Sequence, residues 1–315
     1  MLNLAIVVPC FNEEEALPET NAQLITFLNT LINERKISRF SKIYYVDDGS
    51  FDNTWKTIKE LTSLNNEQIS GLKLSSNYGH QNALIAGLFN SNEDIVITLD
   101  ADLQDDIEII RDMIDKNLEG FDIVYGVRNK RDTDSFFKRV SAHLFYSLMN
   151  ILGTKVIKNH ADFRLLNRKC IEHLKRFREV SLFLRGVIPL IGLKSTNVYY
   201  SRKIRNQGKS KYPLKKMLNF AIDGITSFSI VPLRIVTLTG LIIFLISFIM
   251  SLYVLLLWFF TDKALPGWSS IVLPMYFLGG IQVLFLGVIG EYLGKIYQEV
   301  KDRPRFIIEK MTPKL

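Results

Sequence analysis

The sequence is poor in the residues that organise a protein through covalent or metal cross-links. Its 315 residues contain two cysteines, Cys10 and Cys170, and four histidines. Two cysteines so far apart make neither a disulfide framework nor a metal motif, so we interpret both as structural residues of a protein in a reducing compartment. His80 and His143 have no partners at metal-ligand spacing either, and we expect both to be structural.

The motifs of common nucleotide-binding folds are also missing. No Gly-x-Gly-x-x-Gly follows the first apolar run, which argues against an ordinary dinucleotide-binding fold. There is no Walker-type lysine, which argues against a P-loop. The apolar run of residues 1–8 is short and ends at Pro9, so we expect no signal peptide.

Charge is distributed unevenly along the chain. The formal net charge is +7, with Lys and Arg clustered at 194–234 and 295–314. Between these clusters lie two uncharged runs, 235–260 and 264–290, each long enough to span a bilayer. The runs favour a membrane over nucleic acid as the reason for the basic patches. Because positive charge flanks both ends of this predicted hairpin, we expect a multi-pass protein of the inner (cytoplasmic) membrane with both termini cytoplasmic.

The first 210 residues alternate between short apolar runs and segments with helical spacing. Such alternation predicts an α/β fold with a mostly parallel sheet and helices on both faces. The expected strands are 4–8, 43–46, 71–74, 95–99 and 122–125, and the expected helices are 14–33, 52–64, 82–89 and 107–118.

One expected strand, 95–99, runs directly into Asp100-Ala101-Asp102. Ligands bind at the carboxyl ends of parallel strands, where two carboxylates can hold Mg²⁺ or Mn²⁺ against substrate phosphates. An isolated Asp-x-Asp is more often a solvated turn than a metal site. The other strand ends are polar too: Pro9-Cys10-Phe11-Asn12-Glu13-Glu14, Asp47-Asp48-Gly49-Ser50 and Ser76-Asn77-Tyr78-Gly79-His80. Four such loops at successive strand ends predict a substrate site.

These loops, with Leu99-Asp100-Ala101-Asp102-Leu103-Gln104-Asp105, resemble family 2 glycosyltransferases with the GT-A fold. Three further segments resemble the polyprenyl-phosphate branch of that family, which includes dolichol-phosphate mannose synthases and bacterial bactoprenol glucosyltransferases. They are Gly126-Val127-Arg128, Ala161-Asp162-Phe163-Arg164-Leu165 and residues 205–213. Residues 290–297, Gly-Glu-Tyr-Leu-Gly-Lys-Ile-Tyr, are similar to the bacterial members.

The resemblance implies a division of the chain into four parts. Residues 1–213 would form the Rossmann-like GT-A domain, and 214–233 amphipathic juxtamembrane helices. Residues 234–290 would form two transmembrane helices with a short extracytoplasmic loop, and 291–315 a cytoplasmic tail.

It also implies roles for individual residues. The nucleotide would bind at Pro9, Phe11, Glu13, Asp48, Asp100 and Ala101, with Asp47 either contacting it or supporting the loop. A divalent ion, Mg²⁺ or Mn²⁺, would bind at Asp100, Asp102 and Gln104. We expect Asp105 and Asp106 to lie in a solvated turn that favours the following helix dipole.

Asp162 is the implied catalytic carboxylate. A lipid phosphate is largely anionic at neutral pH, so Asp162 would either act as a base or only orient the acceptor. A loop carboxylate paired with Arg164 is the structural alternative. The implied ligands of lipid phosphate or diphosphate are Arg128, Arg164, Arg205, Lys209 and Lys211, although a generic basic cluster beside a membrane would look similar.

The function implied is inverting transfer of one hexose, glucose from UDP-glucose, to undecaprenyl phosphate at the cytoplasmic membrane face. The lipid-linked sugar would serve surface polysaccharide (O-antigen) modification. Other donors remain open: GDP-mannose, UDP-galactose or a UDP-aminoarabinose derivative. The expected partners are the nucleotide sugar, the polyprenyl phosphate and membrane lipid, with no nucleic acid, in a homo-oligomer (a tetramer by resemblance). A processive synthase would carry Gln-x-x-Arg-Trp, which is missing, and a non-catalytic scaffold would not need the intact carboxylates.

Overall fold

A computed structural model describes residues 1–128, 160–179, 182–201 and 268–313, with single residues between 233 and 249. The chain divides into two compact units. The first contains the described parts of residues 1–211 together with 303–313, and the second contains helix α10 (Trp268–Val300).

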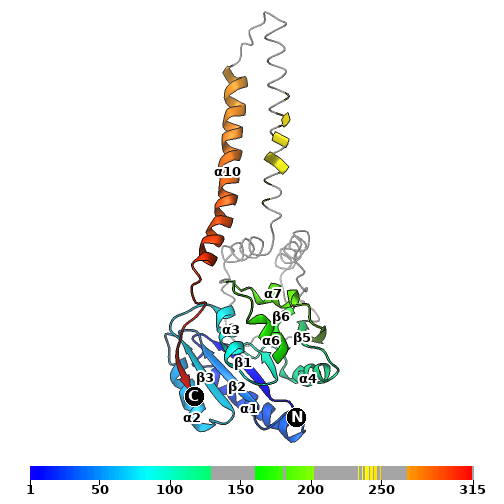
Figure 1. The fold of residues 1–315 in the computed structure, drawn as a ribbon. Coiled ribbons are helices and arrows are strands. Elements are labelled where there is room, and N and C mark those ends of the chain that lie inside the picture. Colours follow the sequence, from blue (N-terminus) through cyan, green and yellow to red (C-terminus); the bar gives the residue numbers. More distant parts are fainter. Residues whose placement is uncertain are drawn as a thin grey trace, which may run out of the picture. The chain divides into compact units, whose positions relative to one another are not determined.

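The first unit is built on one eight-stranded sheet with the order β7-β5-β6-β4-β1-β2-β3-β8 (Figure 1). Its strands are β1 (Leu4–Cys10), β2 (Lys42–Asp47), β3 (Ile69–Leu74), β4 (Ile95–Thr98), β5 (Ile123–Arg128), β6 (His160–Asn167), β7 (Ser195–Tyr200) and β8 (Ile308–Thr312). β1 pairs in parallel with β2 and β4, and β2 with β3. The predicted mostly parallel α/β fold is confirmed.

Two strands break the parallel pattern. β6 lies between β4 and β5 and is antiparallel to both. β8 adds to the free edge of β3, also antiparallel. Neither β6 nor β8 was expected from the sequence, because the strands with which they pair lie far away along the chain.

Helices cover both faces of the sheet, as the alternation of strands and helices predicts. The helices that follow the first strands are α1 (Leu17–Asn33), α2 (Thr54–Leu64), α3 (His80–Asn90) and α4 (Ile110–Leu118), the last preceded by a 3-10 turn, η1 (Ile107–Ile109). Leu4, Ile6 and Val8 of β1 belong to a core shared with α1, α2 and α4. Val7 points to the opposite face, where Gly87 of α3 packs so closely that a Cβ there would lie 2.3 Å from its side chain.

The end of the chain is tied to the carboxyl end of β3. Lys73 forms an ion pair with Glu309 at 2.8 Å, and the Ser75 amide donates to the Ile307 carbonyl at 2.9 Å. Arg305 donates to the Glu179 carbonyl, just after helix α6 (Arg168–Leu174). Residues predicted as part of a separate tail thus complete the sheet, while the remaining domain boundaries stay a prediction.

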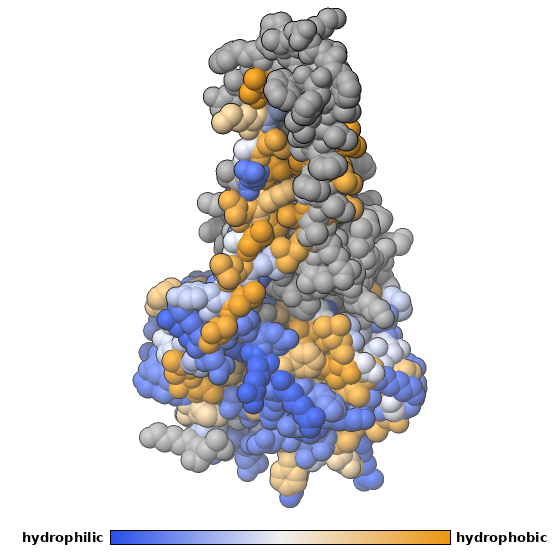
Figure 2. All heavy atoms as spheres, turned by 45° about the horizontal axis from the view of Figure 1, so that its top comes forward, coloured by the Kyte–Doolittle hydropathy of each residue, from blue (hydrophilic) through white to orange (hydrophobic). Residues whose placement is uncertain are grey.

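Helix α10 of the second unit is long and exposes apolar side chains. Ile271, Met275 and Leu286 are among them, and Figure 2 shows hydrophobic surface gathered along this helix. Even so, among the described residues no helix is both long and apolar enough to cross a membrane. This finding contradicts the predicted transmembrane hairpin and the predicted multi-pass location in the cytoplasmic membrane. Neither prediction is kept. Most of the first uncharged run, 235–260, lies outside the described residues.

Candidate active site

The polar loops predicted to form a site meet at one edge of the sheet, which we call the catalytic edge. It comprises the carboxyl ends of β1, β2, β3 and β4 and the start of β6. Parallel register aligns Cys10 with Asp47, and Asp47 with Lys73. Because β6 is antiparallel to β4, its first residues lie beside the last residues of β4. The Thr98 hydroxyl donates to the Asp162 carbonyl and fixes this neighbourhood.

The loop after β2 is organised by two buried carboxylates. Asp48 accepts the backbone amides of Tyr78 and Gly79, at 2.8 and 2.9 Å. Burial raises its pKa, and these two hydrogen bonds only partly oppose the rise. Asp47 accepts the Ser50 amide at 3.0 Å, and its Oδ2 is buried without a hydrogen-bond partner among the described residues. The geometry therefore gives Asp48 a loop-supporting role, and its contact with a nucleotide stays a prediction.

The loop after β1 supplies the other predicted nucleotide residues. Pro9 is buried within β1 and pairs with Val46. Phe11 is 39% exposed and packs edge-to-face on Phe51, with ring centroids 6.0 Å apart. The half-buried Glu13 donates its amide to the Thr54 hydroxyl at 2.9 Å. An exposed aromatic face beside these loops can stack on a nucleotide base.

The Asp-x-Asp turn follows β4, and its two carboxylates differ in exposure. Asp100 is half-buried, whereas Asp102 is exposed. Ala101 between them is buried, and the Thr20 hydroxyl donates to its carbonyl at 2.7 Å. Gln104 is buried and donates its backbone amide to Asp102 Oδ1 at 3.3 Å. The turn is thus anchored by α1 and presents one carboxylate outward.

We tested whether these residues fit a divalent ion. Within the described ranges, no cluster of three or more His, Cys, Asp or Glu residues could hold a metal by itself. Two carboxylates are present, and the buried Gln104 Nε2 has no hydrogen-bond partner. A flip of the Gln104 side-chain amide exchanges its nitrogen and oxygen, so the oxygen then lies where the unpaired nitrogen is. A site with few protein ligands, completed by substrate phosphates, is what Mg²⁺ ordinarily uses, so the residues fit.

Asp162 lies at the centre of a charged cluster. Arg185 donates to both of its oxygens, Nε to Oδ1 at 3.1 Å and Nη2 to Oδ2 at 2.9 Å. Arg164, which is completely buried, forms an ion pair with the same carboxylate. Burial by itself would raise the pKa of Asp162. The hydrogen bond with His80 and the charges of Arg185 and Arg164 outweigh burial and hold that pKa well below its usual range.

His80 joins this cluster to the Asp-x-Asp turn. Its Nε2 lies 3.5 Å from Asp100 Oδ1 and 3.7 Å from Asp162 Oδ2. The hydrogen bond to Asp162 and the charge of Asp100 raise the pKa of His80, even though desolvation lowers it. His80 was expected to be structural, and the structure places its imidazole between two candidate functional carboxylates. Sequence spacing gave no signal for this, since His80, Asp100 and Asp162 come from three separate segments.

The predicted phosphate-binding cations lie in different surroundings. Arg128 forms an ion pair with Asp105 at 3.1 Å and hydrogen-bonds to the Tyr200 hydroxyl, which itself donates to Asp105. Arg164 is buried beneath Asp162, with its Nη1 unpaired, rather than on the site surface. Arg205, Lys209 and Lys211 lie outside the described residues. The expected solvated position of Asp105 is wrong, because this carboxylate is buried; Asp106 does cap the following turn.

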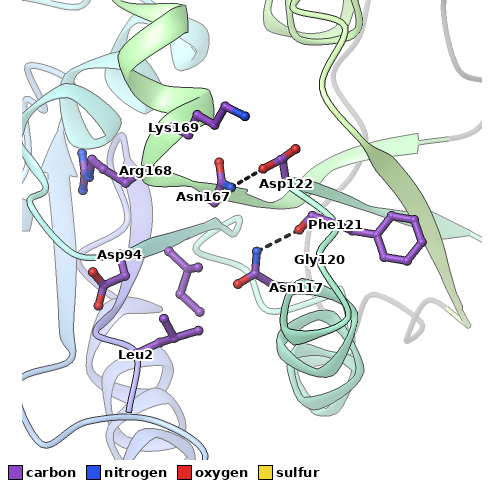
Figure 3. A pocket seen from close by; sticks show the side chains of 10 residues that line it. Leu2, Asp94, Asn117, Gly120, Phe121, Asp122, Asn167, Arg168 and Lys169 are labelled. Carbon is purple, nitrogen blue, oxygen red and sulfur yellow. Dashed lines mark hydrogen bonds between the residues drawn. The ribbon is translucent and has the colours of Figure 1, made fainter.

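A cavity of about 300 Å³ lies at the other end of the strands, where β1, β4 and β5 begin. Asp94, Asp122 and Asn167 are among its lining residues, and Figure 3 shows them around the opening. Asn167 donates to Asp122 at 2.6 Å, and Asp94 accepts the Asn3 amide at 2.8 Å. The polar side chains that line it are half-buried or exposed. We call this the opposite edge.

The catalytic edge defines the class of protein. A mostly parallel sheet whose strand-end loops gather paired carboxylates beside arginines is typical of enzymes that handle phosphorylated substrates. The chain belongs to glycosyl transferase family 2, whose model matches residues 5–175. It is therefore a glycosyltransferase, with the GT-A arrangement expected from the resemblance.

Its relatives match over almost the whole chain. An uncharacterized glycosyltransferase of Bacillus subtilis, YkoT, is 52% identical and aligns with 97% of this chain and 91% of its own length. The SfII prophage-derived bactoprenol glucosyl transferase of Shigella flexneri is 38% identical over 98% of each chain. A solved structure, the Pyrobaculum calidifontis mannosyltransferase PcManGT in complex with GDP-Man and Mn²⁺, aligns with TM-score 0.49 and 15% identity. That alignment covers 72% of this chain and 63% of the other.

Proposed function

We propose that this glycosyltransferase transfers one glucose from UDP-glucose to undecaprenyl phosphate, with inversion at the anomeric carbon. The observation that carries the proposal is the full-length similarity to proteins named bactoprenol glucosyl transferase, at 37 to 38% identity over 98–99% of this chain. The product is a lipid-linked sugar for surface polysaccharide. Assembly as a tetramer stays a prediction.

The chemistry proposed is a single displacement. An oxygen of the lipid phosphate attacks the anomeric carbon, the bond from that carbon to the diphosphate breaks, and UDP leaves. A phosphate monoester is largely ionised at neutral pH, because its second pKa is about 6, so little proton removal is needed. Tight pairing of Asp162 with two arginines supports a role in orientation rather than as a base.

We further propose that Asp100 and Asp102, with Gln104, hold a divalent ion, Mg²⁺ or Mn²⁺. When bound, the ion neutralises the diphosphate and eases departure of UDP. Asp102 is exposed, while the anchored Ala101 keeps the turn in place. Asp48 and the loop it holds would shape the nucleotide pocket around Phe11.

A transfer assay on the full-length protein tests the proposal. The protein in detergent is incubated with Mg²⁺, undecaprenyl phosphate and one labelled donor from a panel of UDP-glucose, UDP-galactose, GDP-mannose and a UDP-aminoarabinose derivative. We expect one labelled lipid carrying a single sugar, formed fastest from UDP-glucose. Preference for another donor would overturn the assignment of glucose, and no lipid product from any donor would overturn the reaction.

A further inference from the structure

Asp162 is shared by two guanidinium groups that differ in exposure. Arg164 is fully buried, whereas the side chain of Arg185 is 33% exposed. One carboxylate therefore orders two guanidinium groups, and of the two only Arg185 has a side chain that solvent can reach.

The Arg185 guanidinium is held in one orientation. Its two bonds to Asp162, at 3.1 and 2.9 Å, form the bidentate fork that arginine makes with carboxylates. Gln81 of α3 links the same elements: its Nε2 donates to Asp162 Oδ2 at 3.4 Å, and its Oε1 accepts the Leu184 amide at 3.3 Å. Helix α7 (Leu184–Leu190) is anchored by Leu184 and Ile188, both fully buried.

Arg185 also lies close to the reacting centre proposed above. His80 connects Asp162 to Asp100, at 3.7 and 3.5 Å. Arg185 is therefore linked to the Asp-x-Asp turn through two side chains, Asp162 and His80. Planar guanidinium groups that are fixed in this way recognise phosphate oxygens well.

We propose that Arg185 binds a substrate phosphate group in the transfer reaction, and that Asp162 is the positioning residue that aims it. The inference rests on the proposed function, since it concerns the phosphates of the same donor and acceptor. The inference gives Asp162 a positioning role instead of a base role, because the oxygens of Asp162 are occupied by Arg164, Arg185 and Gln81. The ligand chemistry is an anionic phosphate oxygen, from the acceptor monoester or the donor diphosphate.

Steady-state kinetics of Arg185→Gln and Arg185→Lys test the proposal. Loss of a hydrogen bond to a charged group predicts a rise of about tenfold to a hundredfold in the KM of one phosphate substrate for Arg185→Gln. A rise in the acceptor KM assigns the lipid phosphate, and a rise in the donor KM assigns the diphosphate. Arg185→Lys keeps the charge and should recover part of the loss.

Arg111→Gln is the matched control, because Arg111 is similarly exposed, at 25%, and is ion-paired to Glu34 and Glu108 away from the site. It should leave both KM values unchanged. Asp162→Asn should raise the same KM as Arg185→Gln and keep the shape of the pH–rate profile. Unchanged KM values in Arg185→Gln would overturn the proposal, as would loss of the acidic limb of the pH–rate profile in Asp162→Asn with no change in KM.

A binding measurement separates this inference from the proposed reaction. Calorimetry with inorganic pyrophosphate plus Mg²⁺, and with farnesyl phosphate, needs no turnover. Weaker binding of either probe to Arg185→Gln than to Arg111→Gln supports the role of Arg185 even if no sugar transfer is detected. Equal binding of both probes to the two variants overturns it.

Discussion

The polar side chains at the two edges of the sheet differ in burial and in hydrogen bonding. At the opposite edge, the polar side chains around the cavity are half-buried or exposed, and Asn167 donates to Asp122. At the catalytic edge, three buried atoms have no partner among the described residues: Asp47 Oδ2, Gln104 Nε2 and Arg164 Nη1. Unpaired buried polar atoms are costly and rare in folded proteins. The difference is that unmet buried polar groups, among the described residues, gather at the edge that carries the candidate site.

The largest effect is expected from Asp102→Ala. If the turn holds the metal, this change removes an exposed ligand and about 3–4 kcal/mol of transition-state stabilisation, or ~100- to 1,000-fold in kcat/KM. Labelled-sugar transfer at saturating Mg²⁺ measures it. A variant with full, metal-dependent activity would refute the metal assignment at the catalytic edge.

Gly49→Ala should come next, because Gly49 lies where two strand-end loops touch. Its φ is +68°, and a Cβ would lie 2.4 Å from the Ser76 carbonyl carbon. Strain and backbone clash together should cost about 2–4 kcal/mol of unfolding free energy and raise the donor KM. Gly120→Ala is the control, since φ is +94° but nothing lies within 4 Å. It should cost about 1 kcal/mol and spare KM; equal costs for the two variants would contradict this account.

Asn167→Ala tests the paired character of the opposite edge. Asn167 accepts the Cys170 amide at 2.8 Å as the N-cap of α6 and donates to Asp122. Loss of the Asn167 side chain should lower the free energy of unfolding by about 1–2 kcal/mol, measured by denaturant titration. Activity per folded molecule should not change. A specific loss of transfer activity would show that the cavity takes part in the reaction.

Asp47→Asn should stabilise the protein slightly, in a pH-dependent way. Burial raises the pKa of Asp47, so the folded state disfavours its charged form. This cost is present at pH 7 and vanishes below the unfolded pKa of about 3.9, where both states are protonated. The variant should gain about 1 kcal/mol at pH 7 and nothing near pH 3.5. Thermal melts at the two pH values measure it, and an equal gain at both would contradict the cause given.

Local patterns predicted the parallel half of the fold well. The strands expected at 4–8 and 95–99 appear as β1 and β4, because buried parallel strands are continuous apolar runs. β6 and β8 could not be predicted in this way, since their pairing joins segments far apart in sequence. β8 carries charged residues, including Glu309 and Lys310, and its edge position hides it from hydrophobic patterning.

The site was predictable to a similar extent. Motif position predicted Asp100 and Asp162 at one edge, and the structure places the carboxylates of both within 3.7 Å of His80 Nε2, while their roles stay predictions. The contacts of His80 and Arg185 with Asp162 could not be predicted, because they join α3, α7 and β6. Asp105 was misjudged for the same reason: its partners Arg128 and Tyr200 come from β5 and β7.

Metal-dependent binding of UDP tests the central claim, that the catalytic edge holds a nucleotide diphosphate through the Asp-x-Asp turn. Calorimetry compares UDP binding with and without Mn²⁺ in the wild-type protein, in Asp102→Asn and in Asn167→Ala. We predict that Mn²⁺ strengthens binding in the wild-type protein and in Asn167→Ala but not in Asp102→Asn. The same Mn²⁺-dependent affinity in all three proteins would contradict the account.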